Sequence, residues 1–121
     1  TTYGGAAVLN SPPATLVLNS GTAATFAKAG LAWPSIVAQG GSRQAWLCGG
    51  TITSLTLSTG ATLDKSADPR AMTITNSTID GDTCQISDPL NAITFTNATT
   101  VKQQVTSGPF LFTGTRTVKV T

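Results

Sequence analysis

The chain contains neither glutamate nor histidine, and charged residues make up only 10% of its 121 residues. A typical globular chain carries about 25% charged residues. Histidine is the commonest general base and metal ligand near neutral pH, and many hydrolases depend on paired glutamates. These absences exclude several familiar catalytic sites. They also argue against long helices, whose exposed faces usually carry Glu and Lys.

The chain also lacks long apolar runs and clusters of like charge. No stretch approaches the roughly 18 apolar residues of a membrane span, and the start lacks the basic-then-apolar pattern of a signal peptide. Four Lys and three Arg are spread along the chain against five Asp, for a net charge of +2. We therefore expect neither a membrane nor a nucleic acid as partner, and a product made in the cytosol.

There are only two cysteines, Cys48 and Cys84, and both stand among small or apolar neighbours. This setting predicts buried free thiols that behave as small hydrophobic residues. A disulfide between them stays open as an alternative, because the sequence does not give their separation.

Threonine, by contrast, occurs 23 times, which favours exposed strand faces. One phrase also occurs twice. Asp-Pro at 68–69 recurs after 20 residues, and Thr-x-Thr-Asn at 73–76 recurs after 21. This spacing is typical of stacked repeat units. The repeated residues, to which we assign structural roles, are Asp68, Pro69, Asn76, Asp88, Pro89 and Asn97.

The pattern predicts an all-β chain that forms a short β-solenoid-like stack of about four rungs of about 20 residues, with a β-sandwich as the alternative. Apolar residues recur at every second position, and the extra residue of the second copy falls in a turn between Pro89 and Ile93. Inside a strand it would turn every following side chain to the other face.

The first 34 residues differ from the rest, so we divide the chain into 1–34 and 35–121. The first part is predicted to be an extended N-terminal arm with one short strand around Leu16–Leu18 and a helical turn within 25–33. The second part is predicted to be the β-rich repeat domain.

Few residues could carry chemistry. Asp80-Gly81-Asp82 lacks the further ligands of a calcium loop and is interpreted as a turn. Asp64 and Asp68 would form a glycosidase-like pair only if the fold brought them together. Asn76 and Asn97 match the glycosylation pattern, but we prefer that they stack on each other in successive rungs. We predict no catalytic residue, no metal site, no cofactor and no enzymatic activity.

Aromatic and apolar residues offer candidate interface positions, since aromatics are enriched in interface cores. For Trp33 and Trp46, capping one end of the stack is an equal alternative. The predicted interface residues are Tyr3, Leu16, Leu18, Trp33, Trp46, Phe110 and Phe112.

The segment from Gly49-Gly50-Thr51 through Thr73-Ile74-Thr75-Asn76, extended to about residue 100, resembles Thr/Gly-rich virion structural proteins of tailed bacteriophages. The resemblance implies a non-enzymatic virus-particle protein located in the virion after assembly in the host cytoplasm. Our first expectation is a homotrimeric capsid cement or decoration protein that binds a major capsid protein or another virion protein. A tail-fibre, spike or adhesin module that binds a surface glycan is the alternative, and a fragment of a polysaccharide-degrading β-helix enzyme is a lesser one.

Overall fold

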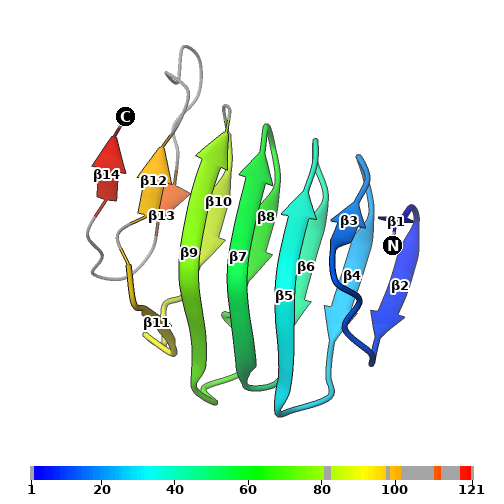
Figure 1. Cartoon of the computed structure of the whole chain (residues 1–121), viewed down its shortest axis with the longest axis horizontal. Coiled ribbons are helices and arrows are strands. Elements are labelled where there is room, and N and C mark those ends of the chain that lie inside the picture. Colours follow the sequence, from blue (N-terminus) through cyan, green and yellow to red (C-terminus); the bar gives the residue numbers. More distant parts are fainter. Residues whose placement is uncertain (1, 81–82, 98, 102–110, 113–117, 121) are drawn as a thin grey trace.

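The computed structural model describes residues 2–80, 83–97, 99–101, 111–112 and 118–120, with side chains as far as residue 97. The described residues form strands and turns without a helix, and every ladder between these strands is parallel. Two sheets lie one behind the other in the view of Figure 1, each extending along the longest axis, and the chain passes from one to the other along most of its length. The all-β solenoid predicted from the sequence is therefore confirmed, and its parallel ladders distinguish it from the antiparallel β-sandwich.

The first sheet contains, in spatial order, β1 (Thr2–Tyr3), β3 (Leu16–Leu18), β5 (Leu31–Ala38), β7 (Gly50–Ser58), β9 (Met72–Asp80), β12 (Thr99–Val101) and β14 (Val118–Val120), with β11 (Ile93–Phe95) also paired to β9. The second contains β2 (Ala6–Leu9), β4 (Ala23–Phe26), β6 (Arg43–Trp46), β8 (Thr62–Asp64), β10 (Gln85–Ser87) and β13 (Leu111–Phe112).

Equivalent positions of successive turns lie directly beside one another in the first sheet. Leu31 pairs with Gly50, Gly50 with Met72, and Met72 with Ile93. The inward side chains consequently stack in columns of similar residues, one of which contains Trp33, Ile52, Ile74 and Phe95. This stacking of like on like explains why the sequence repeats.

The long strands bend in the middle, where two successive residues face outward. In β7 the buried positions change from Ile52 to Leu55, with Thr53 and Ser54 outside; in β9 they change from Ile74 to Ser77. If inward and outward side chains alternated strictly along β7 from Ile52, as expected from the sequence, Leu55 would face the solvent. The bend keeps both halves of the strand facing the core.

The predicted N-terminal arm is wrong for the described residues. Residues from Thr2 to Ala38 contribute β1 to β5 to the same two sheets, and the expected boundary at residue 34 falls inside β5. Pro34 is tolerated there because it lies at the bend, between the paired positions Trp33 and Ser35.

The helical turn predicted within residues 25–33 is also wrong. That range contains the end of β4 and the start of β5. Phe26 and Trp33 are almost completely buried in the core. Burial of these two rings outweighs the weak helix preference of the alanines between them, and so short a helix is marginal by itself.

Length differences between turns are taken up at the corners. In two successive turns, the strand residues on both sides of the corner are paired: Asp64 with Ser87 before the corner and Met72 with Ile93 after it. Seven residues (65–71) therefore form the first corner and five (88–92) the second. The expectation that a turn and not a strand takes up the length difference is confirmed, but the expected extra residue in the second copy is wrong, because the second corner is two residues shorter than the first. The ladders, however, place Asp88 level with Lys65, not with Asp68.

Gly49 marks a corner where two turns approach too closely for any side chain. A Cβ atom built at Gly49 would lie 2.5 Å from the carbonyl oxygen of Ala71. We expect Gly49→Ala to lower the free energy of unfolding by about 1–3 kcal/mol, because backbone must shift to relieve the overlap. Urea unfolding followed by circular dichroism measures this.

Gly4→Ala is the matched control, because a Cβ atom at Gly4 has open space around it. Its stability should stay within about 0.5 kcal/mol of the parent. Equal stability of the two variants would contradict the close approach of the corners.

Candidate functional site

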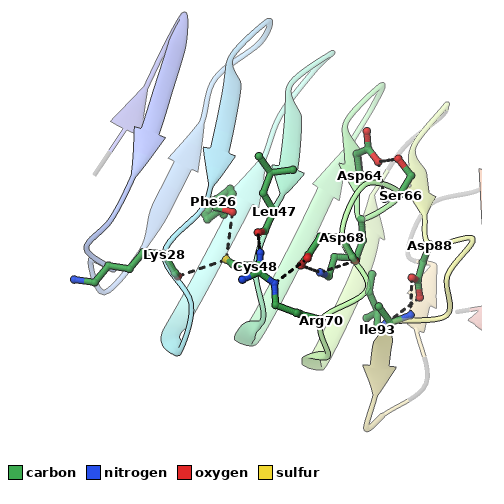
Figure 2. Close-up of polar contacts among 12 residues, drawn as sticks. Phe26, Lys28, Leu47, Cys48, Asp64, Ser66, Asp68, Arg70, Asp88 and Ile93 are labelled. Carbon is green, nitrogen blue, oxygen red and sulfur yellow. Dashed lines mark hydrogen bonds and ion pairs between the residues drawn. The ribbon is translucent and has the colours of Figure 1, made fainter.

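Three charged residues meet at the corner between β8 and β9. The Lys65 ammonium donates to Asp68 Oδ2 at 2.6 Å and to the Asp68 carbonyl at 3.0 Å. Arg70 Nε donates to Asp68 Oδ1 at 2.8 Å, and its Nη2 donates to the Leu47 carbonyl of the previous turn at 2.5 Å (Figure 2). We call Lys65, Asp68 and Arg70 the corner triad.

The register explains why a lysine is buried in the triad. Ala45 pairs with Asp64, so the next residues, Trp46 and Lys65, occupy equivalent positions in adjacent turns. Trp46 itself stacks on Phe26, with ring centroids 4.1 Å apart. The Lys65 side chain has no exposed area. An unpaired ammonium there would be very costly, and the Asp68 carboxylate supplies the compensating charge.

The two repeated aspartates have structural partners, but different ones. Asp88 accepts hydrogen bonds from the backbone N–H groups of Ala92 at 2.8 Å and Ile93 at 2.9 Å, and so fixes the entry into β11. Asp68 instead binds two side-chain cations. The prolines that follow, Pro69 and Pro89, lie exposed on the outside of the turns.

Asp64 is occupied as well, so it does not form a pair with Asp68. Its carboxylate accepts from Ser66 N at 2.9 Å and Ser66 Oγ at 2.5 Å, and it forms an ion pair with Arg43. Partial burial opposes ionisation, but the Ser66 hydrogen bonds and the Arg43 charge outweigh it and hold the pKa of Asp64 below its ordinary value.

Both cysteines are free and buried. The Cys48 Sγ lies 3.2 Å from the Phe26 carbonyl oxygen and 3.4 Å from that of Lys28, so its single S–H group is shared between these two acceptors. Burial raises the pKa of Cys48, with nearby Lys65 and Arg70 partly opposing the rise. Cys84 donates to the Ser58 carbonyl at 3.1 Å. The free-thiol interpretation fits these contacts, and neither thiol is a poised nucleophile.

The repeated asparagines form a ladder at the bend of the first sheet. Asn97 Nδ2 donates to Asn76 Oδ1 at 2.6 Å, and Asn76 Nδ2 donates to the Thr53 carbonyl at 3.4 Å. This confirms the preferred interpretation that these residues stack in successive rungs.

Two straight rows of threonine lie beside the asparagine ladder, on the outer face of the first sheet. Thr51 pairs with Thr73 and Thr73 with Thr94. Thr53 and Thr75 lie level with each other, because the pairs Ile52–Ile74 and Ser54–Asn76 flank them, and the Thr96 hydroxyl donates to the Thr75 carbonyl. We call the six the threonine array: Thr51, Thr53, Thr73, Thr75, Thr94 and Thr96. The sequence reasoning missed it as a site, although the repeated Thr-x-Thr at 51–53, 73–75 and 94–96 could have signalled it.

Most of the predicted interface residues lie inside the protein. Leu16, Leu18, Trp33 and Trp46 are at most 1% exposed, so their assignment to an interface is wrong for the folded chain. These four side chains are buried because each points towards the core from a strand that is paired within one of the two sheets. Tyr3 is half-buried near the N-terminal end of the stack. Phe110 and the side chain of Phe112 lie outside the described part.

Within the described ranges, no group of three or more His, Cys, Asp or Glu residues could hold a metal ion. Asp82 and Gly81 of the acidic turn fall outside these ranges. No helix in the described part is long and apolar enough to cross a membrane. In comparisons with known proteins, no family model matches the chain, and no curated protein or solved structure matches it significantly.

The corner triad yields a stability prediction. Asp68→Asn should destabilise the protein because it leaves the buried Lys65 ammonium without a counter-charge, and the double variant Lys65→Met/Asp68→Asn should recover part of the loss. Chemical unfolding of the parent, both single variants and the double variant measures the coupling. Strictly additive effects of the two substitutions would contradict a direct pairing.

The triad also predicts acid sensitivity. The hydrogen bond from Lys65 holds the pKa of Asp68 below its ordinary value, and Arg70 lowers that pKa further. Burial of the carboxyl group acts in the opposite direction but is outweighed. The unfolded chain therefore takes up this proton at a higher pH, near about 3.9. The stabilisation is complete above that pH and is lost as the pH falls through the lower pKa of the folded state.

We expect the free energy of unfolding of the parent to fall as the pH is lowered from about 5 towards 2, and the fall to be smaller in Asp68→Asn. Urea unfolding at a series of pH values measures both curves. Parallel curves for the parent and the variant would show that Asp68 does not contribute.

Proposed function

We propose that this chain is a non-enzymatic structural protein of a virus particle, in which the solenoid serves as a rigid shaft or spike module. The virion assignment depends on the sequence resemblance. The role within the particle is supported by one structural observation: the first sheet continues without interruption from β1 through β9 to β14 (Figure 1). Such a stack transmits load through backbone hydrogen bonds along its whole length.

Two further features support a structural role over the lesser, enzymatic alternative. Asp64, Asp68 and Asp88 all bind groups of their own corners through hydrogen bonds or ion pairs, and Asp64 also binds Arg43 of the previous turn. The buried thiols donate to carbonyl groups. In the described part of the chain, these groups are used to hold turns together, which leaves little for general acid–base chemistry.

The position of the first 38 residues favours the shaft over the cement role. A cement protein of the kind expected from the sequence would reach a neighbouring subunit with a free N-terminal arm. Here β1 to β5 are stacked in the solenoid. Self-association would then involve the sides of the stack, and we retain a homotrimer as the proposed assembly.

The proposed function predicts an elongated oligomer. Purified full chain should have the mass of a trimer by light scattering, give rod-shaped particles by negative-stain electron microscopy, and run as a trimer on detergent gels without heating. A boiled sample is the control for the monomer. A compact monomer at all concentrations would overturn the shaft proposal, and cleavage of a polysaccharide that is lost in both Asp64→Asn and Asp68→Asn would favour the enzyme instead.

A further inference from the structure

We propose that the threonine array binds the surface of ice. This activity goes beyond the structural role proposed above and does not depend on it. The array comprises Thr51, Thr73 and Thr94 in one row, before the bend, and Thr53, Thr75 and Thr96 in the other, at the bend, all on the outer face of the first sheet.

The spacing of the array is fixed by the backbone in two perpendicular directions. Adjacent parallel strands lie about 4.8 Å apart, and residues i and i+2 of one strand lie about 6.6 Å apart. The strand register aligns the three Thr-x-Thr segments without slippage, since Ile52 pairs with Ile74 and Ile74 with Phe95. Hexagonal ice repeats its surface oxygens at intervals close to both spacings. Its water molecules can therefore meet successive threonines of a row at a regular interval.

The side chains of the array are held in place before any contact with ice. Threonine is stiff about χ1, so little rotamer freedom is lost on binding. On the core-facing side of the sheet, the buried side chains of Ile52 and Ile74 and the half-buried Phe95 pack beneath the three Thr-x-Thr segments. Beside the array, the Asn97–Asn76 hydrogen bond ties successive turns together. The Thr96 hydroxyl donates to the Thr75 carbonyl at 3.3 Å, which leaves its oxygen as an acceptor.

The absence of charge from the array favours ice over other binding partners. Ice is a neutral lattice that excludes ions, and the segments 50–53, 72–75 and 93–96 contain no charged residue. The outer face of the second sheet differs, because it bears the Arg43–Asp64 ion pair. A sugar ring would usually be held by an exposed aromatic side chain, but the aromatic residue of these segments, Phe95, packs against the core.

The partly exposed positions fit contact with a flat surface. Thr53, Thr94 and Thr96 are exposed, whereas Thr51, Thr73 and Thr75 are half-buried between neighbouring rows. Each threonine offers both a methyl group and a hydroxyl group, a combination that contacts water without strong ionic hydration.

The test measures ice recrystallisation and ice-crystal shape with the full chain, and the fraction of fluorescently labelled protein that partitions into a slowly growing ice hemisphere. The variants are Thr73→Lys in the centre of the array and Thr94→Lys at an exposed position. The matched control is Thr25→Lys, which makes the same change on the outer face of the second sheet. Circular dichroism and thermal unfolding identify any variant that fails to fold.

We expect the parent and Thr25→Lys to inhibit recrystallisation, to facet ice crystals and to enter the ice, and folded Thr73→Lys or Thr94→Lys to lose all three properties. The proposal is overturned if the parent behaves as serum albumin does in these assays, or if both array variants retain activity. It is also overturned if the same substitutions abolish only binding to microcrystalline cellulose, or only a dimer seen by light scattering, because the occupant is then a neutral polysaccharide or a second copy of the chain.

Discussion

The parallel backbone ladder is the constraint on which the rest of this structure depends. Each residue of a turn lies beside its equivalent in the next turn, so the side chains at every level must fit the side chains one strand away. The column of Trp33, Ile52, Ile74 and Phe95 satisfies this requirement inside, and the threonine array satisfies it outside. One register therefore determines both the core and the pattern of the surface.

The corner triad shows how the stack accommodates a position that departs from its column. Lys65 follows Phe26 and Trp46 at equivalent levels, where an aromatic or aliphatic residue would be the simple choice. The chain instead places Asp68 three residues later, and the seven-residue corner brings the carboxylate back to the ammonium. The next turn carries Asp88 at that level and has a shorter corner, in which the Asp88 carboxylate binds backbone N–H groups.

The repeat and the alternating apolar residues were sufficient to predict the solenoid and the Asn76–Asn97 ladder, since both follow from period and register. The N-terminal turns were not predicted because their residue types differ from those of the later turns. Their strands nevertheless stack on the later strands at equivalent positions. Phe26 and Trp33 belong to the core although Gly30 and the alanines around them resemble a loop or helix. The partners of Asp68 also escaped prediction: the aligned Asp-Pro pairs suggest equivalence, while the ladders place Asp88 opposite Lys65.

The corners have a consequence for how such a chain can change during evolution. Between ladder pairs that keep their register, one corner contains seven residues and the next contains five. Insertions and deletions of this size leave the strands on either side in place. Duplication of a complete turn would preserve every column as well, provided that the new corner residues supply their own hydrogen-bond partners. A gene of this kind can therefore lengthen by unequal recombination, and its product can grow one turn at a time.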